Sequence, residues 1–134
     1  NLMIEICKKK KMKKVLIVIG GDNRDEISLE GTSDIIEITN EKTQEYTFNF
    51  MNDIKTINPN YDCGDSSLNA RLFKEILKNK DWNHPIIEHI CINASAGFIV
   101  LNKVKTLGEG YEYAKQLFEK EKVTKQILKL QTFS

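Results

Sequence analysis

Two adjacent carboxylates, Asp25 and Glu26, are the residues of this sequence whose types and position are best suited to chemistry. They stand on a polar loop that follows the apolar run 15–19 and the pair Gly20-Gly21. Open α/β sheets bind ligands beside the loops at the carboxyl ends of their strands. Mg²⁺ is commonly held by one or two carboxylates, with waters and substrate phosphates completing its shell. The pair therefore predicts a magnesium site, and the alternative interpretation is a solvated acidic turn.

The other polar residues form no recognisable catalytic set. His89 and Cys91 would face different sides of one helix, which argues against a shared metal site. Asn93 lies within an apolar helical stretch, and a buried amide needs hydrogen-bond partners. We therefore expect Asn93 to tie its helix to a neighbouring element. No nucleophile–base pair is present, so no catalytic residue is expected in this segment.

The strands that must position the carboxylates follow from the hydrophobic pattern. The β-branched run 15–19 predicts a buried strand that ends at Gly20. Residues 34–39 and 43–49 alternate in polarity and are separated by turn residues, so they are expected to form a hairpin. Residues 50–61 are expected to be an irregular loop.

Helices are expected before and after these strands along the sequence. The first covers residues 2–13, and a second runs from Asp65 or Ser66 to about residue 80. Residues 86–101 are apolar all round, which is typical of a buried helix. Thr106 with Glu109 fits a capping box that opens the last long helix, followed by a charged stretch and a final apolar turn near residue 130.

Composition limits the possible partners. A length of 134 residues suits one domain, and a net charge of +1 gives no strong field for nucleic acid or for a membrane surface. The lysines at 8–11 close a helix, where cations offset its dipole; a nucleic-acid patch is the less favoured interpretation because no aromatic residue is interleaved. Three widely spaced cysteines indicate reduced thiols and a cytoplasmic protein.

The order of several short strings resembles the anthranilate phosphoribosyltransferases. The most specific string is Asp25-Glu-Ile-Ser28 after a glycine-ended strand. Gly64-Asp65 with Asn69-Ala70, then Ile92-Asn93-Ala94, and finally Glu109-Gly110 follow in the order of that family, so the resemblance spans nearly the whole chain. Two departures stand out: Ile19 to Arg24 replace the family's His-Gly-x-Asp-Gly-Leu, and Leu68 replaces a glutamate.

The resemblance implies a partial α/β domain of the nucleoside phosphorylase/phosphoribosyltransferase type. Residues 1–134 would be the C-terminal segment of that domain, without the N-terminal helical domain and without the glycine-rich diphosphate loop, and the start at Asn1 fits a piece of something longer. The family transfers a phosphoribosyl group from phosphoribosyl diphosphate to anthranilate in tryptophan biosynthesis. Asp25 and Glu26 would hold Mg²⁺ on the diphosphate, and the complete enzyme is expected to be a homodimer.

Two alternatives stay open from the sequence. One is a pyrimidine nucleoside phosphorylase relative, which shares the general fold but lacks support from the string at 25–28. The other is a non-catalytic subunit or interaction module derived from the fold, which the missing motifs favour for this chain taken alone. In either case the isolated chain is expected to be inactive.

Overall fold

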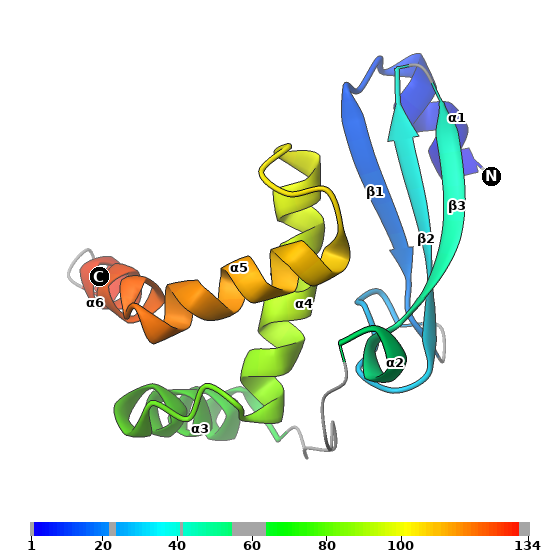
Figure 1. Ribbon diagram of the computed structural model, residues 1–134. Coiled ribbons are helices and arrows are strands. Elements are labelled where there is room, and N and C mark those ends of the chain that lie inside the picture. The colour runs from blue at the N-terminus through cyan, green and yellow to red at the C-terminus, as the bar shows by residue number, and fades with distance from the viewer. Residues whose placement is uncertain (1, 22–23, 41, 55–63, 132–134) are drawn as a thin grey trace.

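The computed structural model describes residues 2–21, 24–40, 42–54 and 64–131. A three-stranded antiparallel sheet lies between the N-terminal helix on one side and the helices of residues 85–119 on the other (Figure 1). The sheet order is β1 (Lys14–Ile19), β2 (Thr32–Thr39) and β3 (Thr43–Asn49). The α/β class expected from the sequence is therefore confirmed, with the hairpin of β2 and β3 at the predicted place.

The register of the sheet places the loop after β1 next to the start of β2. Ile19 is the partner of Asp34, and Lys14 at the other end is the partner of Thr39. Ile35 and Ile38 of β2 are both fully buried, but they stand three residues apart and therefore lie on opposite faces of the strand. The strand is thus buried on both faces: Ile35 belongs to the main hydrophobic core, whereas Ile38 lies outside it.

Strand β1 differs from the prediction of a fully buried strand. Its residues are only partly buried, and Ile19 is 44% exposed. The reason is its place at the edge of the sheet, where only one side of the strand is paired by a described residue. A run of β-branched residues cannot by itself distinguish a central strand from an edge strand.

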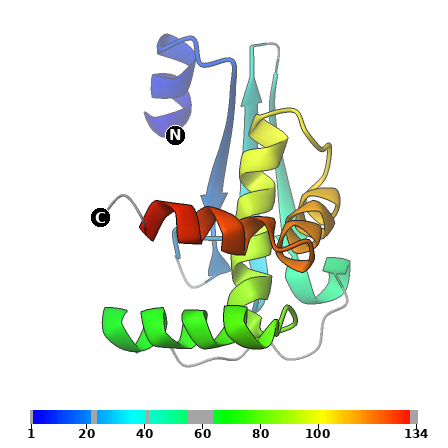
Figure 2. The same ribbon diagram turned by 90° about the vertical axis from the view of Figure 1, so that its left-hand side faces the viewer.

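Helix α4 (Pro85–Val100) lies beside the sheet, on the side opposite the N-terminal helix, as Figures 1 and 2 show. It packs against β1 on one side and against α5 (Leu107–Glu119) on the other. The fully buried residues Ile87, Ile92 and Ile99 lie along it. The predicted buried helix is confirmed, apart from Ile90 and Leu101, which are exposed.

The remaining helices are α1 (Leu2–Lys9), α2 (Phe50–Ile54), α3 (Ser66–Asn79) and α6 (Lys122–Gln131). Helix α1 is shorter than predicted because the chain reverses at Lys11, which has a left-handed φ of 52°. The final apolar residues form a separate helix, α6, rather than a turn. No helix in the described part of the chain is long and apolar enough to cross a membrane.

Helix α2 corrects the expectation of an irregular loop from residue 50 onward. Phe50 is fully buried, and its ring meets that of Tyr111 edge to face, with centroids 5.7 Å apart. Burial of one aromatic side chain thus holds a short helix for which the local sequence gave no periodic signal. The part of the predicted loop from residue 55 to 61 lies outside the described residues.

The other helix signals agree with the structure. The Asp65 side chain accepts a hydrogen bond from the Leu68 amide and caps α3. At the start of α5 the Thr106 hydroxyl accepts from the Glu109 amide, as predicted, while the Glu109 carboxylate accepts from the amide of Lys105, one residue before the expected partner of a capping box. Tyr111, Ala114 and Phe118 are buried as expected. Caps act within a single turn of the chain, which is why the sequence could place them.

Candidate functional site

The loop that carries the candidate carboxylates folds back on the end of β1. The Gly20 amide donates a hydrogen bond to the Arg24 carbonyl at 2.8 Å, which closes the loop. A Cβ atom at position 20 would lie 2.1 Å from the Glu26 carbonyl oxygen. No side chain can occupy that space without moving backbone, so the close return of the loop requires glycine at this position.

Both predicted metal ligands lie at the surface of this loop. Asp25 and Glu26 are exposed, and Asp25 has no hydrogen bond or ion pair with another described residue. The Glu26 carboxylate lies 3.2 Å from Nε2 of His89, which is mostly buried on α4. Asp22 and Asn23, at the tip of the loop, lie outside the described residues.

Helix α4 holds the loop in place through two side chains that are one helical turn apart. His89 reaches Glu26, and Asn93 reaches the backbone of Ile27. The Asn93 Oδ1 atom accepts from the Ile27 amide at 2.8 Å, and its Nδ2 atom donates to the Ile27 carbonyl at 3.2 Å. Residues four apart share one face of a helix, so α4 presents both groups to the loop together. The expectation that Asn93 ties α4 to a neighbour is confirmed.

The chain after the carboxylates is held by serine side chains. The Ser28 amide donates to Ser33 Oγ at 2.9 Å, and the Glu30 amide donates to Ser28 Oγ at 3.1 Å. Ile27 and Leu29 are buried on either side of Ser28. The carboxylates therefore project from a loop whose next residues are fixed in the core, although the carboxylates themselves face solvent.

This donor set fits a hydrated magnesium ion, because Mg²⁺ needs only one or two protein carboxylates and keeps several waters. Asp25 offers an oxygen pair without a described competitor, and Glu26 is shared with His89. The described residues hold no group of three or more His, Cys, Asp or Glu side chains that could bind a metal. An all-protein metal cage is thus excluded among them, while the two exposed carboxylates of the loop supply the number of protein donors that a hydrated ion needs.

The histidines and cysteines serve separate purposes. His84 caps α4, since its Nδ1 atom accepts from the Ile86 amide at 3.2 Å. Cys91 is fully buried, and burial first, then the nearby charge of Glu88, raises its pKa to about 12. Cys7 and Cys91 are both free thiols, as predicted, and Cys63 lies outside the described residues. A thiol with so high a pKa is protonated at neutral pH and is a poor nucleophile.

A buried polar cluster between α4 and α5 was missed by the sequence reasoning. Glu88 is 5% exposed, accepts a hydrogen bond from the Tyr111 hydroxyl, and forms an ion pair with Lys115. Burial, followed by the hydrogen bond to Glu88, raises the pKa of Tyr111. The available signal was Glu88 itself, the one acidic residue within the apolar stretch 85–101. A charge in such a stretch must be paired to be buried.

The α4–α5 contact that carries this cluster depends on a small residue. A Cβ atom at Gly110 would lie 2.5 Å from Cβ of Ser95, so the two helices approach closely at that point. Ser95 is fully buried, and Trp82 packs against Phe118 farther along α5. This packing supports the face of α4 opposite the sheet, and thereby holds the helix that supports the candidate loop.

Comparisons with known proteins agree with this arrangement. Residues 1–122 match the model of the glycosyl transferase family, a/b domain. Anthranilate phosphoribosyltransferase of Streptococcus thermophilus is 29% identical over 121 residues, which cover 89% of this chain and 36% of that protein. The enzyme of the same name from Sulfolobus acidocaldarius is 32% identical over 108 residues, covering 80% of this chain and 32% of that protein.

A solved structure shares the fold. It is anthranilate phosphoribosyltransferase from Saccharomyces cerevisiae in complex with 4-fluoroanthranilate, with a TM-score of 0.63 and 19% sequence identity over 80% of this chain and 32% of that chain. The chain thus spans about a third of the length of the relatives that it matches. Since the family model covers all but the last twelve residues, 123–134, the chain belongs to the glycosyl transferase family, as part of its a/b domain.

Proposed function

We propose that this chain is the segment of an anthranilate phosphoribosyltransferase that supplies a magnesium site for the diphosphate of phosphoribosyl diphosphate. The observation that carries the proposal is the loop 24–28, whose exposed carboxylates Asp25 and Glu26 project from a backbone fixed by Asn93 and Ser33. The similarity to enzymes of that name over most of the chain supports the same reaction for the complete protein.

In that reaction the bond between C1 of the ribose and the diphosphate oxygen breaks, and a bond from C1 to the anthranilate nitrogen forms. The amine gives up a proton, and diphosphate leaves with the electron pair of the broken bond. Mg²⁺ bound at the carboxylates would neutralise charge on the departing diphosphate. Asp25 would supply the unshared ligand, while His89 would orient Glu26 through their contact of 3.2 Å.

The experiment that tests the proposal removes both carboxylate charges in the complete enzyme. We expect Asp25→Asn with Glu26→Gln to weaken turnover and to shift its Mg²⁺ dependence to higher concentration. Stability should change by less than about 0.5 kcal/mol, because both residues are exposed on a loop. The matched control is Glu30→Gln, an exposed acid a few residues farther along the chain. An unchanged Mg²⁺ titration of the double variant would remove the metal assignment.

The chain by itself is not expected to catalyse the transfer. Phosphoribosyl transfer requires the diphosphate, the ribose and the amine to be held in line, and such positioning supplies much of the acceleration. Among the described residues, we assign only the two carboxylates of one loop to these groups. Residues 1–134 with Mg²⁺, phosphoribosyl diphosphate and anthranilate should therefore show no loss of anthranilate fluorescence. Turnover on the order of 1 per second would place the active site elsewhere in the chain.

A further inference from the structure

Helices α3 and α6 run side by side, on the side of α4 that faces away from the sheet (Figures 1 and 2). They are joined at one end, where Lys80, directly after α3, forms an ion pair with Glu121, directly before α6. Because α3 runs toward this junction and α6 runs away from it, the two helices are antiparallel. A groove of about 390 Å³ lies between them, and none of its described lining residues belongs to the candidate metal loop.

The groove is lined by apolar side chains that remain open to solvent. Leu77 of α3 and Ile127 of α6 line it and are half-buried, whereas Leu128 lines it and is 57% exposed. No residue of α6 is buried, although one face of this helix is apolar. An amphipathic helix normally covers its apolar face by packing. Helix α6 is therefore only partly covered by the described part of the chain.

Basic side chains accompany this apolar groove. Lys74 and Lys78 line it from α3, and Arg71 lies on the same face of the helix, one turn before Lys74. None of these three side chains forms an ion pair with a described acidic residue. Helix α6 itself contains three lysines and no acidic residue. Since the described lining includes no carboxylate, the groove combines an apolar surface with a positive potential.

From this combination we propose that the groove between α3 and α6 docks an acidic amphipathic helix of a partner protein. Two neighbouring helices leave a concave surface into which a third helix packs, with axes about 8–10 Å apart. The apolar face of the partner helix would contact Leu77, Ile127 and Leu128. Its carboxylates would lie opposite Lys74 and Lys78. Docking of an amphipathic helix into an apolar groove is a common mode of protein recognition.

Charge and shape favour this occupant over the alternatives. Two copies of the chain that met groove to groove would bring Lys74 and Lys78 of both copies together, and like charges oppose association. A flat anionic bilayer would contact the projecting Leu128 but not the half-buried Leu77 and Ile127. No aromatic residue is among the described lining residues, so single-stranded nucleic acid would find no ring on which to stack its bases.

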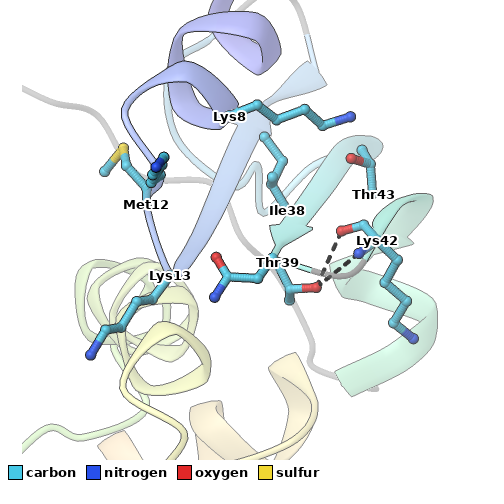
Figure 3. A pocket seen from close by; sticks show the side chains of 9 residues that line it. Lys8, Met12, Lys13, Ile38, Thr39, Lys42 and Thr43 are labelled. Carbon is cyan, nitrogen blue, oxygen red and sulfur yellow. Dashed lines mark hydrogen bonds between the residues drawn. The ribbon is translucent and has the colours of Figure 1, made fainter.

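The lysines at the hairpin end of the sheet show the contrasting arrangement. In Figure 3 the side chains of Lys13 and Lys42 point away from the hollow that they border. Both residues are exposed, so their charges are solvated and do not converge on a ligand. The groove between α3 and α6 differs because its basic side chains flank apolar ones that a partner helix can cover.

The test measures binding of a designed peptide to the 134-residue chain. The peptide has about 15 residues, enough for a marginally stable helix, with leucines on one face and glutamates on the other. We expect saturable binding in calorimetry, with amide NMR shifts concentrated at Leu77 and Leu128. Lys74→Glu/Lys78→Glu should weaken binding at least about tenfold, because it places like charges opposite each other. Leu128→Gln should weaken binding several-fold by removing an apolar contact.

Matched controls separate the groove from general surface effects. Lys8→Glu/Lys9→Glu makes the same change of charge on exposed residues of α1, which lies on the far side of the sheet (Figure 1). At about 150 mM salt such distant charges are largely screened, so this variant should bind the acidic peptide like the parent chain. Leu101→Gln is the control for Leu128→Gln, because Leu101 is 65% exposed and lies outside the groove. Each variant must keep the circular dichroism spectrum of the parent chain.

A peptide with lysine in place of every glutamate provides a charge-swap test. It should bind the Lys74→Glu/Lys78→Glu variant more tightly than it binds the parent chain. The proposal is overturned if the acidic peptide does not bind at about 1 mM, if both charge-reversed variants lose equal affinity, or if a glutamine peptide binds equally well. Anionic vesicles that bind more tightly than the peptide, with loss of binding in Leu128→Gln, would assign the surface to a membrane instead. Dimerisation that Leu128→Gln abolishes in sedimentation experiments would assign it to a second copy.

Discussion

At the scale of single residues, Asn93 has the clearest measurable role in the candidate site. Its side chain satisfies both backbone polar groups of the fully buried Ile27 and also donates to the His89 carbonyl at 3.0 Å. Leaving a buried polar group without a partner costs about 1–3 kcal/mol. We expect Asn93→Ala to lower the free energy of unfolding by about 2 kcal/mol or more, measured by urea titration.

Asn69 provides the control for that substitution. It makes the same pair of bonds, to the amide and the carbonyl of Gly64, each at 3.0 Å, but at an exposed site. Water can replace these bonds, so Asn69→Ala should cost clearly less than Asn93→Ala. If the two variants lowered the free energy of unfolding equally, the hydrogen bonds from Asn93 to Ile27 would stabilise the fold no more than exposed bonds do.

Gly20 gives a second test at this scale. An alanine Cβ there would meet the Glu26 carbonyl oxygen at 2.1 Å, whereas a Cβ at Gly97, within α4, would meet nothing within 4 Å. Gly20→Ala should therefore displace the carboxylate loop, lower stability and weaken Mg²⁺-dependent turnover of the complete enzyme. Gly97→Ala should raise helix stability by about 0.5–1 kcal/mol. A fully active, fully stable Gly20→Ala variant would contradict the observed loop closure.

At the scale of elements, the contact between α4 and α5 contains the charged cluster of Glu88, Tyr111 and Lys115. The Glu88 side chain is 6% exposed and that of Lys115 is 16% exposed. Removing one partner of a buried ion pair commonly costs about 3–5 kcal/mol. We expect Glu88→Gln to destabilise the chain strongly. The surface pair of Lys80 and Glu121 is the control, since water replaces a lost surface contact and Glu121→Gln should cost far less than Glu88→Gln.

The same helix contact predicts a loss of stability in alkali. The Cys91 thiol has its pKa raised to about 12 in the folded chain, from an ordinary value of 9.0, and burial is the main cause. Above pH 9 the unfolded chain releases this proton while the folded chain keeps it, so the free energy of unfolding falls as the pH rises. The limiting slope for this one group is about 1.4 kcal/mol per pH unit.

Urea titrations at successive pH values above 8 would measure this slope. The raised pKa of Tyr111 acts in the same direction above its ordinary value of 10.0. Cys91→Ala should reduce the fall of the free energy of unfolding with pH between pH 9 and 10. A smaller slope should remain, because other groups of the chain also titrate in this range. An identical slope in this variant would contradict the protonated state assigned to the buried thiol.

At the scale of the whole molecule, the sheet ends in a strand whose outer side is unpaired within the described residues. Strand β1 is apolar, and its last residue, Ile19, is 44% exposed. Open strand edges are templates for pairing with another chain. We expect the isolated chain to self-associate in sedimentation experiments, and Ile19→Lys to reduce this tendency. Leu101→Lys, at a residue that is 65% exposed beyond α4, should leave it unchanged.

The sequence by itself determined the features that depend on local chemistry. These features are the alternation of polar and apolar residues in the strands, the helix caps at Asp65 and Thr106, and the apolar composition of α4. Each of them can be recognised within a short segment of the chain. The string at 25–28 and the order of the later strings indicated the family, which the match over residues 1–122 shows. The assignment of Mg²⁺ to Asp25 and Glu26 stays a prediction that the proposed double substitution would test.

Only the tertiary structure decided the features that depend on contacts distant in sequence. The pairing of Glu26 with His89, the tie from Asn93 to Ile27 and the burial of Glu88 by Tyr111 join segments more than twenty residues apart. The edge position of β1 depends on which strands pair, and the helix at Phe50 depends on the ring of Tyr111. Periodicity within one segment shows that a face will be covered, but the partner that covers it is chosen by packing over the whole chain.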